Sequence, residues 1–219
     1  DVTAGLGHYY DLCAEHIQKD RCREAIDALV GYWVDNDFNI WHIDGENKTP
    51  ILGFTDGKTL NMRIMMAIAG AKTAHHATGN PKYLAAYEKL LTQYNVRGIT
   101  EFKTEKDFDD GEHVFNHLEN LFRMETEPEL LAAYRAILDG LWANHSGDAQ
   151  SLFTYIYMSL VPDAPDRDQA LKQALFSLQT WPTDTTLQPR MSSLNPDLKP
   201  PFPLYAAAWD NEYIWKGNL

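Results

Sequence analysis

Apolar side chains recur at spacings of three and four along most of the chain, and this pattern predicts amphipathic α-helices. The helices pair through short turns into four predicted hairpins, which cover residues 2–35, 58–94, 112–142 and 150–181. Hairpins that recur at roughly fifty residues indicate an α/α repeat array. No domain boundary is visible between the hairpins, so we expect an all-α fold in a single domain over residues 1–219.

The first hairpin is predicted to turn near Lys19–Asp20, after a helix over residues 2–18. The spacing of its apolar positions would place one face of this helix in the core. The members of that face are Leu6, Tyr9, Tyr10, Cys13 and Ile17. In the second hairpin, the first helix is apolar on nearly all sides, so we expect it to be buried more deeply than the amphipathic helix over residues 81–94.

Residues typical of helix ends mark two further turns. In the second hairpin, Gly79 lies just past one helix and Pro81 just inside the next, an asymmetry that helix termini favour. In the third hairpin, Thr126 and Glu129 have the spacing of a capping box. Both signals predict short turns between antiparallel helices.

The connections between hairpins are longer than the turns within them. These links cover residues 37–57, 95–111, 143–149 and everything after Trp181. Because antiparallel helices alternate in direction, the links should emerge together at one end of the array, where loops commonly carry function. Alternating residues 40–43 followed by Asp44–Gly45 predict a small β-hairpin in the first link. The proline-rich segment 182–219 is expected to run extended, with a short helical turn near residues 205–209.

The charge balance restricts the kinds of molecule that the protein is expected to bind. The chain has 31 acidic and 19 basic residues, a formal net charge of −12, which disfavours nucleic acids and anionic membranes. No apolar run is long enough to cross a bilayer, so we expect no membrane insertion. The chain begins at Asp1 rather than Met, so we expect a preceding segment to have been removed; the compartment stays open, with the periplasm or the extracellular space favoured.

The two cysteines are too few for a disulfide framework and lack metal-binding spacing. We expect Cys13 and Cys22 to be small buried thiols, and a bridge across the first hairpin is the alternative.

Four segments of the sequence resemble a known class of protein. They are DVTAGLGHYYDLC, DNDFNIWHIDGENKTPILGF, AIAGAKTAHHATGNPKYLAAYEKL and NHSGDAQSLFTYIY. They are similar to a poorly characterised family of bacterial α/α-toroid proteins, whose architecture resembles the six-hairpin glycosidases and the toroidal polysaccharide lyases. The resemblance implies a partial or closed toroid and a carbohydrate-related activity. Two departures are visible, since we count four hairpins rather than six and no motif identifies the paired carboxylates of those glycosidases.

The hypothesis of a glycoside hydrolase requires two carboxyl groups at the open end of the array. Asp148 and Asp1, both at predicted helix starts, are the candidate acid/base pair, with His8 and His145 nearby and Glu112 in reserve. In the competing interpretation, the aspartates cap helices and the histidines are paired structural residues.

A polysaccharide lyase would instead use a histidine or tyrosine base beside a cation that neutralises a uronate. His8, Tyr9 and His145 are candidate bases, and Arg63 is the candidate cation. A lyase is the weaker enzyme hypothesis, because a net charge of −12 disfavours a polyanionic substrate.

An oligosaccharide or polysaccharide is the expected ligand, because aromatic faces and polar side chains suit sugar rings. The candidate substrate-binding residues are Trp41, His42, Asn61, Arg63, Glu112, His113, Asn116 and Trp209. His8, His145 and Asp148 would form a metal site if their helix starts met, but no metal motif supports this, so we expect no metal or cofactor. A noncatalytic glycan-binding or scaffold domain stays open as the second hypothesis.

Overall fold

The computed structural model describes residues 2–41, 52–55, 57–102, 108–146 and 150–179, and side chains are described for all of these except 108–110. Eight α-helices and a two-stranded sheet lie within these ranges, which confirms the all-α class. The chain divides into two compact units, residues 1–104 with 109–141 and residues 105–108 with 142–219. The single domain over residues 1–219 stays a prediction.

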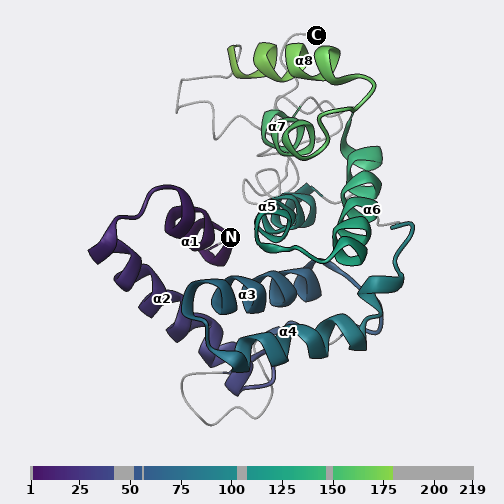
Figure 1. Cartoon of the computed structure of the whole chain (residues 1–219). Helices are drawn as coiled ribbons and strands as arrows, with labels where there is room; N and C mark the ends of the chain where they lie inside the picture. Colours follow the sequence, from purple (N-terminus) through teal and green to yellow (C-terminus); the bar gives the residue numbers. More distant parts are fainter. Residues whose placement is uncertain (1, 42–51, 56, 103–107, 147–149, 180–219) are drawn as a thin grey trace, which may run out of the picture. The chain divides into compact units, whose positions relative to one another are not determined.

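The helices of the first unit follow the order of the predicted hairpins (Figure 1). Its elements are α1 (Val2–Leu12), α2 (His16–Asp35), β1 (Asn39–Ile40), β2 (Leu52–Gly53), α3 (Met62–Thr78), α4 (Pro81–Gln93), the 3₁₀ helix η1 (Val96–Gly98), α5 (Phe108–Met124) and most of α6 (Pro128–His145). The second unit contains the end of α6 together with α7 (Ser151–Leu160) and α8 (Arg167–Gln179). No helix in the described ranges has the length and apolar character needed to span a membrane.

Helix α3 forms the centre of the first unit, between α4 on one side and α1 and α5 on the other (Figure 1). Ten of its residues are buried, against five in α4, which confirms the predicted difference. The turn between them also confirms the prediction from sequence: Gly79 adopts a left-handed conformation (φ 68°), and Pro81 opens α4 behind the capping residue Asn80.

The first hairpin turns earlier than predicted. Helix α1 ends at Leu12 and α2 begins at His16, because Glu15 and Gln18 form a capping box that starts a new helix. The predicted buried face of the helix over residues 2–18 is also wrong, since none of its five members is buried and Tyr9 is 40% and Ile17 72% exposed. The buried residues of α1 are the small ones, Thr3, Ala4 and Gly7.

The cysteines differ from each other in burial. Both are free thiols, Cys13 exposed in the turn after α1 and Cys22 buried in α2. The expectation of two buried thiols is therefore wrong for Cys13. The Cys22 thiol donates to the Leu6 carbonyl of α1 at 3.3 Å, so it lies directly beneath the first helix.

Side-chain contacts fix the relative directions of the odd-numbered helices in this unit. Along α1 and α3, Gly7 lies at Thr73 and Asp11 at His76. Along α1 and α5, Thr3 lies at His117 and Asp11 at Arg123. Residue numbers increase together in both pairings, so α1, α3 and α5 run in the same general direction and begin at the same end of the unit.

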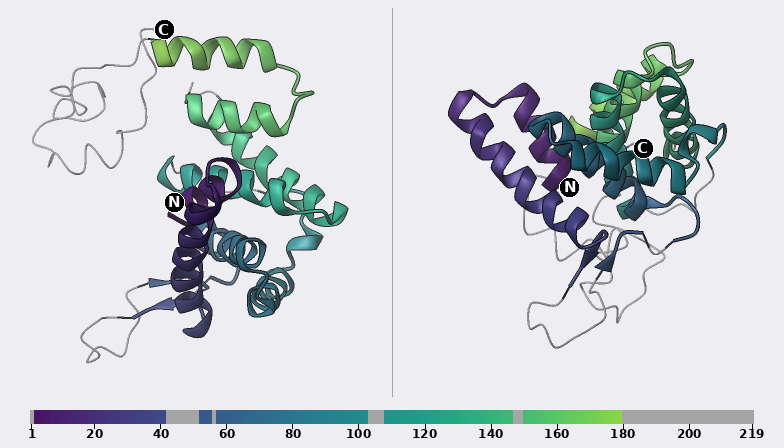
Figure 2. Two further views of the ribbon diagram at one scale, coloured as in Figure 1. Left: turned by 60° about the vertical axis from the view of Figure 1, so that its left-hand side comes forward. Right: turned by 60° about the horizontal axis from the view of Figure 1, so that its bottom comes forward.

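A small antiparallel sheet follows α2, as the sequence predicted (Figure 2). Asn39 pairs with Gly53 and Ile40 with Leu52. The expected turn at Asp44–Gly45 lies outside the described residues. The chain enters β1 through two consecutive left-handed residues, Asp37 (φ 51°) and Phe38 (φ 60°), a conformation that costs energy for any residue other than glycine.

The second unit is built on the α7–α8 hairpin, whose helices lie side by side (Figure 2). Trp142 stacks on Tyr157 with ring centroids 4.6 Å apart, and His145 meets the edge of Phe153. Helix α8 begins at Arg167, two residues after the predicted start at Pro165. The extended tail and its helical turn lie outside the described residues.

Candidate functional site

A series of polar contacts joins α1 to α5, and we call it the α1–α5 ladder. The Thr3 hydroxyl lies 3.3 Å from His117 Nε2, and the Asn120 amide donates to the Ala4 carbonyl at 2.9 Å. One turn further along α1, His8 Nε2 contacts Glu119 Oε2. At its end, Asp11 lies 3.2 Å from the Arg123 guanidinium. The ladder thus consists of Thr3, Ala4, His8 and Asp11 on α1 with His117, Glu119, Asn120 and Arg123 on α5.

The sequence of α5 produces this ladder through two stripes on one helix. Polar residues recur at spacings of three and four, beside an apolar stripe that is buried in the core. The polar stripe is His113, Asn116, His117, Asn120 and Arg123, and the apolar stripe is Val114, Phe115, Leu118 and Leu121. On α1, Gly7 allows the close approach, since a Cβ there would lie 3.0 Å from Asn120 Nδ2.

The two histidines of the ladder differ in the atoms that surround their rings. His117 Nδ1 lies 2.6 Å from the His113 carbonyl and must donate to it, so Nε2 of a neutral ring accepts from Thr3. Burial lowers the pKa of His117 to about 4, which agrees with a neutral ring. His8 instead places Nδ1 2.8 Å from the Ala4 carbonyl and Nε2 against a carboxylate. Both of its nitrogens therefore face oxygen acceptors.

The end of the ladder is joined to α3 by a second histidine. His76 Nε2 lies 2.8 Å from the Asp11 carboxylate, whose other oxygen faces Arg123. Arg123 Nε also lies 3.4 Å from Glu119, and its remaining nitrogen donates to Asn120. One guanidinium and two imidazoles therefore surround the two carboxylates of Asp11 and Glu119.

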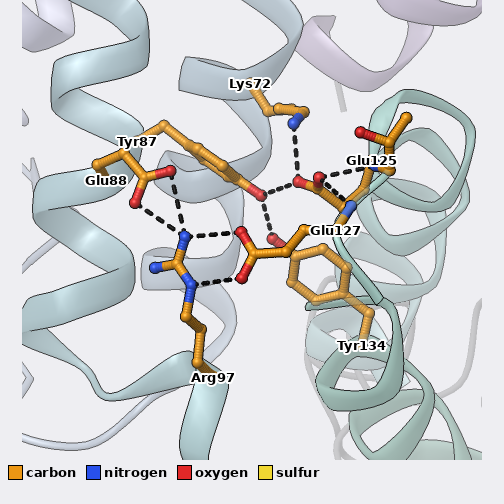
Figure 3. A network of polar contacts seen from close by, with 8 residues as sticks. Lys72, Tyr87, Glu88, Arg97, Glu125, Glu127 and Tyr134 are labelled. Carbon is orange, nitrogen blue, oxygen red and sulfur yellow. Dashed lines mark hydrogen bonds and ion pairs between the residues drawn. The ribbon is translucent and has the colours of Figure 1, made fainter. Parts of the chain in front are cut away.

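A second polar cluster surrounds Glu125, in the short turn between α5 and α6 (Figure 3). Lys72 and the Tyr87 hydroxyl each donate to its Oε2 atom at 2.7 Å. The backbone amides of Thr126 and Glu127 donate to Oε1 at 2.7 and 2.9 Å. We call this the Glu125 network.

The tyrosines extend the network into the core. Tyr87 and Tyr134 place their hydroxyl oxygens 2.6 Å apart. Because the carboxylate can only accept, the Tyr87 hydroxyl donates a hydrogen bond to Glu125 and the Tyr134 hydroxyl donates one to Tyr87. Burial raises the pKa of both tyrosines. Burial would also raise the pKa of Glu125, but the bonds from Lys72, Tyr87 and the two amides outweigh it and lower that pKa to about 2.

Arg97 of η1 extends the same region towards the surface (Figure 3). Its guanidinium donates to both carboxylate oxygens of Glu127, at 2.7 and 2.9 Å, and to Glu88. The predicted capping box at Thr126 is misplaced by one residue, because α6 begins at Pro128 and Glu127 occupies the N-cap position. The amide of Thr126 is bonded to Glu125 instead.

Four of the candidate residues in the first unit lie on α1 and α5. His8 is on α1 and contacts Glu119, and Glu112, His113 and Asn116 are half-buried residues of α5. The His113 carbonyl accepts from His117, which connects this group to the ladder.

The remaining described candidates lie at or before helix starts. Asn61 caps α3 by accepting from the Ile64 amide at 3.1 Å, and Arg63 is exposed in the first turn of that helix. Trp41 follows β1 and donates its backbone amide to the Tyr32 hydroxyl. His145 is buried in the second unit, against Phe153. The other candidates, Asp1, His42, Asp148 and Trp209, lie outside the described residues.

The chain matches no family model, no curated protein and no solved structure. Within the part that the structure describes, no three His, Cys, Asp or Glu residues are grouped so that they could hold a metal ion. The resemblance to toroid enzymes therefore stays an expectation from the sequence.

Sequence reasoning missed His117, Glu119, Asn120, Arg123 and the whole Glu125 network. The sequence did contain a signal for the α5 residues of the ladder, since polar residues recur at helical spacing through α5. Glu125 carried no comparable signal, because its side-chain partners Lys72 and Tyr87 come from two other helices.

Proposed function

We propose that this chain is a carbohydrate-active domain of the α/α-toroid class, which binds a glycan at the end of the first unit where α1, α3 and α5 begin. The observation that carries the proposal is the common direction of α1, α3 and α5, which follows from the pairings of Asp11 with His76 and of Thr3 with His117. It brings the starts of three helices to one end of the first unit. The first half of α5 and the start of α3 supply the polar side chains.

The side chains near these helix starts have the chemistry that a sugar requires. Arg63 is an exposed cation, and Glu112, His113 and Asn116 offer a carboxylate, an imidazole and an amide. Such groups bond sugar hydroxyls and transfer protons. We favour hydrolysis over elimination, and Asp148 and Asp1, which lie outside the described residues, stay predictions from the sequence for the acid/base roles.

A noncatalytic glycan-binding domain is the second candidate, and a specific observation favours it. Several polar side chains of the first unit already serve the fold: Asn61 caps α3, His117 bonds Thr3, and Glu125 binds Lys72. Side chains so engaged stabilise helices and need no substrate to explain them.

The test is a screen of the purified chain against a glycan array, followed by turnover assays on every glycan bound. We expect Arg63→Ala to weaken binding at least tenfold and Arg21→Ala, an exposed arginine of α2, to leave it unchanged. Asp148→Asn should abolish turnover while binding persists, with the exposed Asp163→Asn as the matched control. Binding without turnover of any glycan would favour the noncatalytic domain, and the absence of any binding would overturn both candidates.

A further inference from the structure

Helix α8 of the second unit lies beside α7 (Figure 2), and its buried residues are small. They are Ala170, Ala174 and Ser177, spaced four and three residues apart along one face of the helix. Small side chains allow a close approach of two helices but remove little apolar surface from water. Helix α8 therefore differs from the usual surface helix, which turns its large apolar side chains towards the core.

The leucines of α8 form a second stripe, displaced by one residue from the buried one. Leu171, Leu175 and Leu178 have the same spacing of four and three, and we call them the α8 leucine stripe. Leu171 is half-buried, whereas Leu175 is 50% and Leu178 48% exposed. Single exposed leucines are common on protein surfaces, but a contiguous apolar stripe marks a surface that another segment or chain can cover.

A segment that follows α8 along the chain has the composition to cover this stripe. It consists of residues 202–215, FPLYAAAWDNEYIW, which lie outside the described residues. Tyr205, Trp209 and Tyr213 recur every four residues, and the three alanines between the first two favour a helix. Residues four apart share one face of a helix, so these aromatic side chains would form an apolar stripe of their own. Trp215 would lie off that stripe.

We propose that segment 202–215 docks on the α8 leucine stripe of the same molecule, with its own aromatic stripe against the leucines. Docking removes the apolar surface of both stripes from water at once. Trp209, a candidate glycan contact from the sequence, is thereby assigned to the covering of α8 instead.

The chain between the two stripes is long enough for this contact within one molecule. Residues 180–203 connect the end of α8 to the segment. Fully extended, they reach about 80 Å, whereas the 13 residues of α8 span only about 20 Å. The connection can therefore return the segment to any point on α8. The tether also holds the segment at an effective concentration on the order of 1 mM, an advantage that a second copy of the chain does not have.

Nuclear Overhauser effects measured on the full chain with labelled methyl groups test this contact. We expect effects between the indole protons of Trp209 and the methyl groups of Leu175 and Leu178. Trp209→Ala should remove these effects and accelerate amide exchange in α8, while the amides of α4 keep their rates. Trp215→Ala is the matched control, a tryptophan of the same segment off the aromatic stripe, and it should retain both the effects and the exchange rates.

The possible results separate this contact from its alternatives. Effects that appear only between differently labelled copies would assign the leucine stripe to a dimer and overturn the proposal. Leucine methyl groups without any contact to Trp209 overturn it as well, and so does faster exchange of α8 in Trp215→Ala but not in Trp209→Ala.

Should Trp209→Ala fold poorly, Leu178→Gln changes the other side of the contact. An unchanged set of effects from Trp209 to Leu175 together with unchanged exchange of α8 in that variant would overturn the proposal. These readouts involve no glycan, so a failure here is distinguishable from a failure of the proposed function.

Discussion

The Glu125 network and the α1–α5 ladder are both polar clusters in the first unit, but they differ in how completely their groups are paired. Glu125 accepts four hydrogen bonds of 2.7 to 2.9 Å and its side chain is 5% exposed. In the ladder, within the described part of the chain, Arg123 Nε and Nη1 are buried beside carboxylates without an aligned hydrogen bond.

The two clusters also differ in the groups that titrate. The donors to Glu125 are an ammonium, a phenol and backbone amides, none of which changes charge near neutral pH. The ladder contains the imidazole of His117, whose pKa burial lowers to about 4, so its ring becomes charged in acid. The difference teaches that similar numbers of polar contacts can build either a constant anchor or an attachment that responds to pH.

The largest expected effect comes from removing the carboxylate of the Glu125 network. Glu125→Ala leaves the Lys72 ammonium and the Tyr87 hydroxyl buried without their acceptor, so we expect a loss of about 3–5 kcal/mol in the free energy of unfolding. Urea unfolding measures it, with the exposed Glu24→Ala as a control expected within about 0.5 kcal/mol of wild type. Equal losses in the two variants would show that the network is not an anchor.

The ladder should weaken in acid because of His117. Its pKa of about 4 lies below the ordinary value, so the unfolded chain binds more protons and stability falls as the pH drops from about 6.5 to 4. The lowered pKa of His117 corresponds to a loss of about 3 kcal/mol in the free energy of unfolding across this pH range. Unfolding measured at several pH values should show this decline in wild type and a flatter profile in His117→Gln. Parallel profiles would contradict it. The Glu125 contribution is lost only below about pH 4.5, towards its pKa of about 2.

The direction of the tyrosine hydrogen bonds predicts unequal losses. Tyr87→Phe removes the donor to Glu125 and the acceptor for Tyr134, whereas Tyr134→Phe removes one bond. We expect the free energy of unfolding, measured in urea, to fall by about 2 kcal/mol in Tyr87→Phe and by about 1 kcal/mol in Tyr134→Phe. The reverse order would mean that Tyr134, not Tyr87, carries the more important contact.

The smallest effect concerns the close approach of α1. In Gly7→Ala, the new Cβ would lie 3.0 Å from Asn120 and 3.2 Å from Thr73, both buried, so α1 must shift outward. Gly5→Ala meets no atom within 4 Å and should gain helix propensity. We expect Gly7→Ala to be less stable than Gly5→Ala by about 1–2 kcal/mol in thermal or urea unfolding. Equal stabilities would indicate that the interface tolerates the extra methyl group.

Local patterns predicted the parts of the fold that depend on neighbouring residues. These parts are the Gly79–Pro81 turn, the deep burial of α3 and the strand pair after α2. They could be predicted because backbone preference and apolar spacing act over a few residues. The errors lie where two local signals competed. The helical spacing of apolar residues continues from α1 to Ile17 and predicts one helix. The Glu15–Gln18 capping box instead starts a new helix at His16.

The sequence by itself determined the all-α class, the order of the helices and the polar stripe of α5, since these follow from spacing within single helices. Only the tertiary structure decided that this stripe faces α1, that Glu125 gathers Lys72, Tyr87 and two amides, and that His8 has acceptors on both nitrogens. Those outcomes depend on which faces of distant helices meet, and the pairing of faces is set by the packing of the whole unit rather than by any single segment.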